Sequence, residues 1–524
     1  MLPSCSPNFL LQRALTLFPN APALRNDERE IRFGELGERV FRAANALAAA
    51  GVTEGARVAV ISQDNQQAVE LFLATLWRSA VFVPLHAALH PRQLAAMLTD
   101  AQPTLVAADP LHLPLAETAI GLANLHPHIW VLGEASDRSS ALAYVSLLAA
   151  ASPEPNESRV TPQTPAAMCY TPGTADRRKG VVLTHANLWS AALQLATAVP
   201  VAPGQAGVVG ALPLYRALGW NQIVYLLAQG AEMLLLPNTS PTAWQAVLSR
   251  ADVVAMTPLQ LRRWLAHADE WPVRPKAGCR VLLCGGPVPE ALLSQAESAL
   301  GIQAYVSYGL TEATGPVTCA LAPSGQWHAD RQEPAAVGRP LPGIAIELVD
   351  DTDQPLPHDG VQEGEVMVRA PGIMAGFWQA PEVTEARLKD GWLLTGDLGT
   401  LDADGILRLT GRRLRQIVSG GETIGITEVQ DVLYRHPAVR EAVVYAVPDE
   451  ELGERVEALV TLKTGASLTE AELKAFCAEH LAPFEVPAQI QFVSESPRTA
   501  SGKVIRHTVR EKYIERGRKK GETG

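Results

Sequence analysis

Short apolar runs typical of strands alternate with longer amphipathic runs typical of helices along most of the 524-residue chain. The first clear example is RVAVIS (57–62), followed by AVELFLATLWRSA (68–80) and VFVPL (81–85). A second helix-like run, HPRQLAAMLTDA (90–101), leads into PTLVAAD (103–109). Strands separated by helices pair in parallel, and the helices then cover the faces of the sheet. The alternation therefore predicts an α/β fold built on parallel sheets.

The pattern changes twice towards the C-terminus. Three strand-like segments between residues 344 and 411 are joined by Gly, Pro and Asp, which predicts a small β-barrel-like part of the large N-terminal region. After Arg412 the pattern differs again. Helix-like runs occupy 428–436 and 467–481, and strand-like runs occupy 441–448 and 457–463. We therefore predict an N-terminal domain over residues 1–412 and a mobile α+β domain over 413–524, with a hinge near Arg415.

Composition excludes several classes of protein. The chain is 47% hydrophobic and 19% charged with a net charge of −11, which argues against a nucleic-acid-binding surface. Its six cysteines form no CxxC pair, a usage typical of a reducing cytosol. The longest apolar runs are too short for a membrane span, and the N-terminus lacks the features of a signal peptide. We expect a cytoplasmic protein without nucleic-acid partners or a membrane span.

Six motifs follow one another in a fixed order. They are YTPGTADRRKGVVLTH (170–185), LLCGGPVP (282–289), YGLTE (308–312), GWLLTGDLG (391–399), GRRLRQIVSGGETI (411–424) and PRTASGKVIR (497–506). As an ordered set they resemble the adenylate-forming superfamily of acyl-CoA synthetases, peptide-synthetase adenylation domains and luciferases. The resemblance implies activation of a carboxylic acid by ATP to an acyl-adenylate, with release of pyrophosphate. The small C-terminal domain then swings, and the acyl group passes to a thiol.

The resemblance also assigns the nucleotide contacts. Tyr308 matches the aromatic residue that stacks on adenine, and Asp397 matches the carboxylate that accepts hydrogen bonds from the ribose hydroxyls. Arg412 matches the guanidinium that reaches the same sugar. The expected nucleotide-binding residues are Gly286, Pro287, Tyr308, Gly309, Asp397 and Arg412.

Three residues carry the expected catalytic roles. Lys503, in TASGK, matches the mobile lysine that stabilises charge developing on the carboxylate and the α-phosphate. Thr311 matches a hydroxyl that contacts phosphate. Glu312 matches the carboxylate that helps to hold Mg²⁺, a cation that prefers oxygen ligands.

CoA and acyl contacts follow from two further segments. The SGGE stretch resembles the CoA-ligase version of the linker, so Ser419, Gly420 and Gly421 are the expected CoA-binding residues. Arg216 stands where the family usually has a histidine beside the acyl and pantetheine tunnel. It either meets a polar or anionic group of the substrate or forms a surface ion pair. The expected acyl pocket comprises Arg216, Trp220, Leu310 and Gly315.

The phosphate loop departs from the family pattern, which reads close to YTSGTTGxPKG. Pro172 removes a hydroxyl and a backbone N–H, Ala175 removes a second hydroxyl, and Asp176 adds negative charge. Arg177 and Arg178 replace an apolar residue and a proline, and they could offset the charge of Asp176. The surviving residues of the loop are Thr171, Gly173, Thr174 and Lys179.

These losses are selective, because the loop serves the β- and γ-phosphates of ATP. We therefore expect an acyl-CoA ligase that mainly forms the thioester from CoA and a preformed acyl-AMP, while a role for ATP and Mg²⁺ is doubtful. A separate adenylating enzyme would supply the acyl-AMP, as the further resemblance to non-adenylating ligases of bacterial diterpenoid antibiotic pathways suggests. The alternatives are a full ATP-dependent carboxylate–CoA ligase, acyl transfer to a carrier-protein phosphopantetheine, and a catalytically inactive AMP-binding scaffold. The acid itself stays open.

Overall fold

A computed structural model describes the following parts of the chain: residues 5–26, 29–63, 66–133, 141–156, 159–171, 178–236, 238, 240–267, 274–321, 336–412, 416–449 and 451–493. The chain is divided into two compact units. The first comprises residues 1–87, 94–171 and 179–413, and the second comprises residues 88–93, 172–178 and 414–524. No helix in the described ranges has the length and apolar content that crossing a membrane requires.

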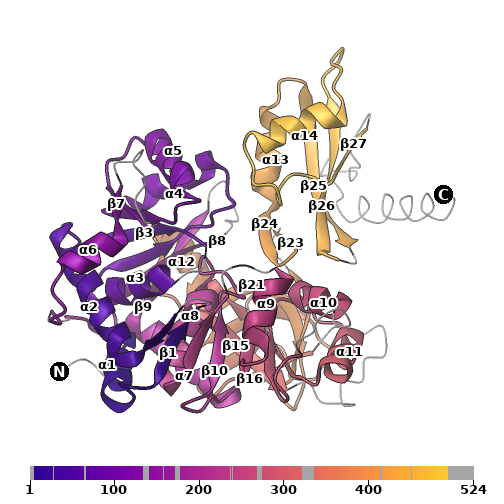
Figure 1. The fold of residues 1–524 in the computed structure, drawn as a ribbon. Helices are drawn as coiled ribbons and strands as arrows, with labels where there is room; N and C mark the ends of the chain where they lie inside the picture. The colour runs from indigo at the N-terminus through magenta and orange to yellow at the C-terminus, as the bar shows by residue number, and fades with distance from the viewer. Residues whose placement is uncertain are drawn as a thin grey trace. The chain divides into compact units, whose positions relative to one another are not determined.

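The first unit contains an eight-stranded sheet among its described residues (Figure 1). Its strands, in spatial order, are β19 (Gly376–Phe377), β9 (Lys179–Thr184), β8 (Pro165–Thr171), β4 (Val81–Pro84), β3 (Arg57–Ile61), β5 (Leu105–Ala108), β6 (His128–Val131) and β7 (Leu142–Ala143). The central strands β4, β3, β5 and β6 are parallel. This confirms the parallel pairing that the alternating pattern predicts.

A second, 14-stranded sheet completes the framework of the first unit. Its strands, in spatial order, are β17 (Ala345–Val349), β18 (Gly364–Arg369), β21 (Trp392–Leu401), β22 (Leu407–Arg412), β16 (Ala336–Pro340), β15 (Gly315–Leu321), β14 (Gln303–Leu310), β13 (Arg280–Leu283), β12 (Val253–Met256), β10 (Ala206–Val209), β11 (Glu232–Leu235), β1 (Pro22–Arg25) and β2 (Glu30–Arg32), with β20 (Leu388–Lys389) beside β21. Strands β10 to β14 pair in parallel. The β-rich segment from β15 to β22 is antiparallel.

The helices described before residue 388 connect and cover these strands (Figure 1). They are α1 (Pro7–Leu17), α2 (Phe33–Ala49), α3 (Gln66–Trp77), α4 (Pro91–Ala101), α5 (Leu113–Ala123), α6 (Tyr144–Ala150), α7 (His185–Ala198), α8 (Ala217–Gln229), α9 (Pro241–Leu248), α10 (Pro258–Ala266), α11 (Glu290–Leu300), the 3₁₀ turn η1 (Thr311–Ala313) and α12 (Pro381–Arg387).

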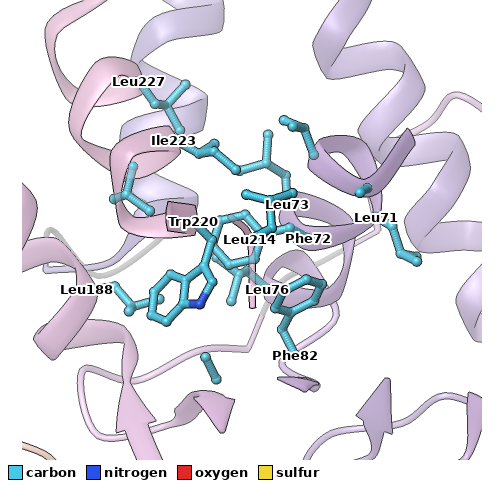
Figure 2. Packing of buried hydrophobic residues seen from close by; sticks show 14 of the residues in the cluster. Leu71, Phe72, Leu73, Leu76, Phe82, Leu188, Leu214, Trp220, Ile223 and Leu227 are labelled. Carbon is cyan, nitrogen blue, oxygen red and sulfur yellow. The ribbon is translucent and has the colours of Figure 1, made fainter. Parts of the chain in front are cut away.

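Helices α3 and α8 meet in the main hydrophobic core, which Figure 2 shows at close range. The ring of Trp220 lies 5.7 Å from that of Phe72, which in turn lies 5.0 Å from Phe82 on β4. All three side chains are 0% exposed. Burying an aromatic side chain of this size contributes about 1.5–3 kcal/mol, so this cluster holds α8 firmly on the framework.

The second unit has a core of its own. Its elements after residue 414 are β23 (Gln416–Ser419), β24 (Glu422–Gly425), α13 (Ile426–Arg435), β25 (Val439–Asp449), β26 (Gly453–Leu462), α14 (Glu470–Ala478) and β27 (Gln489–Phe492). The strands form one mixed sheet, because β27 runs parallel to β26 while the other pairs are antiparallel. Apolar residues of α13 and α14 pack against that sheet. This is the separate α+β domain that the sequence predicts.

Candidate active site

Residues from three motifs meet around one buried carboxylate in the first unit. Asp397 on β21 is 4% exposed and stands directly opposite Arg412 on β22. The Nε of Arg412 donates to Oδ1 of Asp397 over 2.7 Å. Tyr308, near the end of β14, donates its hydroxyl to Oδ2 over 2.6 Å. Both carboxylate oxygens therefore have a donor, which fixes the orientation of the group.

The hydroxyl of Tyr308 stays protonated in this setting. Burial raises the pKa of Tyr308 well above its usual value, and the negative charge of Asp397 raises it further. Tyr308 thus remains a hydrogen-bond donor at physiological pH. The resemblance assigns stacking on adenine to this ring, whereas the structure adds a contact of the hydroxyl that no sequence pattern indicates.

Neighbouring residues hold the part of β21 that carries Asp397. The backbone N–H of Gly396 donates to Oε1 of the buried Glu365 over 3.0 Å. The hydroxyl of Thr395 donates to the carbonyl of Val366 over 2.7 Å and accepts from the N–H of Asp397 over 3.1 Å. Strand β18 therefore holds Thr395 and Gly396, and Thr395 in turn holds Asp397, so the carboxylate is preorganised.

Thr311 and Glu312 lie in the short turn η1, directly after β14. At the preceding Gly309 an added Cβ would stand 2.2 Å from the carbonyl oxygen of Gly315, so only glycine fits there. The carbonyl of Glu312 accepts from the N–H of Met374 over 2.8 Å. The turn is thereby tied to the segment before β19, while the side chains of Thr311 and Glu312 are only partly buried.

The chemistry of Glu312 fits the magnesium role that the family implies. Mg²⁺ is usually held by one or two carboxylates together with substrate phosphates rather than by an all-protein cage. The described residues contain no group of three His, Cys, Asp or Glu side chains that could hold a metal by themselves. A single partly exposed carboxylate at a turn is therefore a suitable protein ligand for a nucleotide-bound Mg²⁺.

The predicted adenine wall and Arg216 lie close together. Gly286 and Pro287 follow β13 at the carboxyl edge of the parallel strands, where ligands of open α/β sheets bind. A guanidinium nitrogen of Arg216 would lie 3.7 Å from a Cβ at Gly285. Arg216 also lies over the ring of Tyr215, 5.8 Å from its centroid. The structure thus brings one residue of the predicted acyl pocket beside the predicted nucleotide site.

The other predicted acyl-pocket residues have different environments. Trp220 is fully buried in the core (Figure 2). Leu310 is partly buried at the end of β14, and Gly315 begins β15 with a φ of +156°. The amide of Asn221, which the sequence reasoning missed, would lie 3.6 Å from a Cβ at Gly315. Nothing in the local sequence marks Asn221, because an amide within a helix is usually exposed.

The phosphate loop connects two antiparallel strands whose ends are well defined. Thr171 at the end of β8 pairs with Lys179 at the start of β9. Gly173 and Thr174, like the substituted Pro172, Ala175 and Asp176, fall outside the described residues. Arg415 and Lys503 do as well, so their predicted roles stay predictions.

Arg178, the last residue of the loop, takes part in an ion-pair cluster of the second unit. Its guanidinium pairs with the carboxylate of Glu485 and lies 3.5 Å from that of Glu428. The Nε2 of Gln93 donates to Glu428 over 2.9 Å and to Glu485 over 2.8 Å. The side chain of Glu485 is fully buried and that of Arg178 is 11% exposed. A buried carboxylate of this kind needs its cation.

Burial and two neighbouring charges act on the pKa of Glu485. Burial raises the pKa of Glu485 above its usual value, Arg178 opposes that rise, and the nearby Glu428 adds to it. Burial has the largest effect on this pKa, because the side chain of Glu485 has no contact with solvent. Among the described residues, Arg178 is therefore the cation that pairs with Glu485.

The predicted CoA-binding segment is a tight hairpin turn in the second unit. Ser419 and Glu422 face each other at the ends of β23 and β24. Gly420 and Gly421 between them have φ values of +60° and +87°, which two-residue hairpins require and glycine readily adopts. The N–H of Gly420 donates to the carbonyl of Leu452 over 2.9 Å. The hairpin therefore favours glycine at both positions for its backbone conformation, in addition to the predicted role in CoA binding.

Comparisons with known proteins place this arrangement in a family. The profile of the AMP-binding enzyme family matches residues 11–378, and that of the AMP-binding enzyme C-terminal domain matches residues 428–503. This chain belongs to the AMP-binding enzyme family. It lies in the acyl-CoA ligase branch of these adenylate-forming proteins. The 2-succinylbenzoate–CoA ligase of Geobacillus kaustophilus is 32% identical over 506 residues, which is 96% of this chain and 97% of that protein. The feruloyl-CoA synthase of an Amycolatopsis species is 32% identical over 509 residues, 96% and 98% of the two chains.

Solved structures have a similar fold over nearly the whole length of the chain. A double mutant of o-succinylbenzoate CoA synthetase from Bacillus subtilis, bound with a product analogue, gives a TM-score of 0.83 at 26% identity, covering 95% of this chain and 97% of the other. The amide bond synthetase McbA from Marinactinospora thermotolerans gives a TM-score of 0.85 at 27% identity, covering 97% and 99%. The same fold therefore also occurs in an enzyme that is named for the synthesis of amide bonds.

Proposed function

We propose that this chain is an acyl-CoA ligase that mainly performs the second half of the family reaction. In that half, the sulfur of CoA attacks the acyl carbonyl of an acyl-adenylate and forms the thioester bond. The bond between the acyl carbon and the phosphate oxygen breaks, AMP leaves with the electron pair, and the thiol proton passes to solvent. Relatives named for CoA ligation over nearly the full chain support the overall activity.

The ion pair of Arg178 supports the finer claim of the proposal, that the chain adenylates acids poorly. Pro172, Ala175 and Asp176 remove two hydroxyls and an N–H from the phosphate loop and add a negative charge. Arg178 is one of two cations in the loop that could offset that charge. Because its guanidinium is engaged by the buried Glu485, it is held away from this task. This engagement supports a loop that binds the β- and γ-phosphates of ATP poorly.

The magnitudes favour a large loss of adenylation. A hydrogen bond to a charged group contributes about 1.5–3 kcal/mol, and two or three of them amount to several decades of rate if they form in the transition state. The AMP side has no such defect, since Asp397 has both of its oxygens oriented by Tyr308 and Arg412. The sequence therefore weakens polyphosphate binding and leaves the groups proposed to hold AMP in place.

The remaining residues take the following proposed roles. Asp397 accepts hydrogen bonds from the ribose hydroxyls, and the glycine turn at Gly420 and Gly421 lets the pantetheine chain approach the backbone. Glu312 would hold a Mg²⁺ ion bound with the nucleotide, and that ion would supply positive charge against the phosphate. Lys503 would stabilise charge on the α-phosphate. A reaction that adenylates a carboxylic acid must then supply the substrate, which we assign to a separate enzyme.

A split assay tests the proposal. The purified chain receives either an acyl-AMP with CoA or the free acid with ATP, Mg²⁺ and CoA, and acyl-CoA formation is followed by mass spectrometry. We expect at least about 100-fold faster product formation from acyl-AMP. A loop-restored variant (Pro172→Ser, Ala175→Thr, Asp176→Gly) is expected to gain pyrophosphate release. Efficient pyrophosphate release by the unchanged chain would instead establish an ordinary ATP-dependent ligase.

The same assay separates the alternative acceptors. CoA, a phosphopantetheine carrier protein and a primary amine are compared as acceptors of one acyl-AMP, because a structural relative is named an amide bond synthetase. We expect CoA to react fastest, given the CoA-ligase type of sequence at Ser419 to Glu422. AMP binding without transfer to any acceptor would favour an inactive scaffold.

A further inference from the structure

Helix α8 carries a buried amide whose donor has no partner. Gln222 is 4% exposed, and its Nε2 makes no hydrogen bond to any residue in the described ranges. The adjacent Asn221 is 0% exposed, and both polar atoms of its amide lack a partner among the same residues. Burying a polar group without a hydrogen bond costs free energy, and folds rarely retain such groups without a reason. A bound group with an acceptor oxygen would satisfy the donor of Gln222.

Gln222 faces a small cavity that is otherwise apolar. The cavity lies between α7, α8 and strands β10, β12 and β13. Apart from Gln222 and Tyr225, the residues that line it are apolar. Of these two, Tyr225 already donates its hydroxyl to the carbonyl of Val199. The Nε2 of Gln222 is thus the unsatisfied donor that the described lining offers. The cavity volume is about 10 Å³, which is the room that one water-sized group needs.

We propose that this cavity receives the neutral, oxygen-bearing tip of the acyl group, which accepts a hydrogen bond from Nε2 of Gln222. The inference rests on the proposed function, because it takes the acyl group of the adenylate as the ligand. A hydroxyl or carbonyl oxygen matches the size of a water molecule, whereas an aromatic ring or an alkyl branch exceeds it. Gln222 is accordingly the specificity-determining residue.

Charge and distance narrow the substrate class. The lining carries no cation, so a second carboxylate in this cavity would be buried without compensation. Gln222 lies six positions after Arg216, the N-cap residue of α8, so their backbones are about 9 Å apart along a helix that rises 1.5 Å per residue. Arg216 lies beside the predicted nucleotide site. The substrate is therefore an acid with an apolar body and one neutral oxygen remote from its carboxyl group. A 3-(4-hydroxyphenyl)propanoyl group has these features.

Binding of unreactive acyl-adenylate analogues tests this inference without any turnover. Acyl sulfamoyl adenosines are prepared in hydroxylated and unhydroxylated pairs of three chain lengths, and their Kd values are measured by calorimetry. For one pair, we expect the hydroxylated analogue to bind about 10- to 100-fold more tightly, since a site built for a hydroxyl discriminates strongly against its absence. Gln222→Met is expected to bring that ratio close to one. A matched analogue with a terminal carboxylate should bind more weakly than the unhydroxylated one.

Gln194 on the neighbouring helix α7 provides a matched control. It is also buried, but its Nε2 donates to the carbonyl of Pro342 over 3.1 Å. Gln194→Met should lower the Tm and leave the selectivity ratio unchanged. Gln222→Met should leave the Tm unchanged or raise it, because it removes an unsatisfied donor.

Several results would overturn the inference. A ratio that is the same in the wild type and in Gln222→Met shows that Gln222 does not contact the acyl group. If Gln222→Met lowers the Tm and leaves the ratio of Kd values unchanged, the amide of Gln222 binds a structural water molecule instead of the acyl group. Absence of binding by every analogue contradicts both proposals. Selective binding without acyl-CoA formation would contradict the proposed function alone and leave this inference standing.

Discussion

Replacing Arg178 by methionine tests the contact on which the proposed half-reaction depends. The change removes the cation from a fully buried Glu485 but leaves its hydrogen bonds from Gln93 and from the N–H of Ala482, at 2.8 and 3.0 Å. Breaking a buried ion pair by removing one partner typically costs 3–5 kcal/mol, because the remaining charge stays uncompensated. We therefore expect Arg178→Met to lower the free energy of unfolding by about 3–5 kcal/mol near pH 8.

The loss should depend on pH with a defined sign. Burial raises the pKa of Glu485, so the folded chain holds this proton more tightly than the unfolded chain does. The stability that this group contributes is present at low pH and is lost as the pH rises through the folded pKa. Without Arg178 that pKa rises further, and Glu428 remains nearby. The difference between wild type and Arg178→Met should therefore grow from about pH 5 to about pH 8.

Urea unfolding of the full chain, followed as a double-mutant cycle with Glu485→Gln, measures both effects. We expect the double variant to regain most of the lost stability and to show little pH dependence. Lys474→Met is the control in the same unit, since Lys474 pairs with Glu470 at the surface, and should cost about 1 kcal/mol or less. A neutral Arg178→Met would refute the reasoning. Arg178 would then be free to reach phosphate, and the proposed loss of adenylation would lose its structural support.

Two further predictions concern the first unit. Tyr308→Phe keeps the ring but removes the donor to Asp397, and we expect a loss of about 1.5–3 kcal/mol in the free energy of unfolding. An unchanged urea midpoint would show that the hydroxyl does not hold the carboxylate. Burial raises the pKa values of Cys169 and Cys284 to about 12, so both thiols should resist alkylation at pH 8 until urea is added. Mass spectrometry after iodoacetamide treatment checks this, and rapid labelling of the native chain would contradict it.

Local sequence patterns were sufficient for the framework. Strands such as β3, β4 and β5 were predictable because a run of four apolar residues between helices has few other ways to be buried. The family was equally accessible, since ordered motifs report chemistry that requires particular residue types. The resemblance places both Asp397 and Arg412 at the ribose, and the structure pairs them across two antiparallel strands.

The partners of individual side chains were not predictable in the same way. The hydroxyl of Tyr308 reaches Asp397 across 89 residues of sequence, and Arg178 reaches Glu485 across 307. A residue's type states which bonds it can form, but only the folded backbone decides which partner lies within reach. Arg178 could have served phosphate or a carboxylate, and the sequence left both open.

The sequence by itself determined the α/β framework, the separate C-terminal domain, the family and the defects of the phosphate loop, because periodicity, turn chemistry and motif order are local properties. Only the tertiary structure decided that Trp220 packs in the core, that Arg178 is bound by a buried glutamate, and that Gln222 presents an unsatisfied donor to a cavity. The physical reason is that burial and hydrogen-bond satisfaction depend on neighbours distant in sequence, and those neighbours are set by packing.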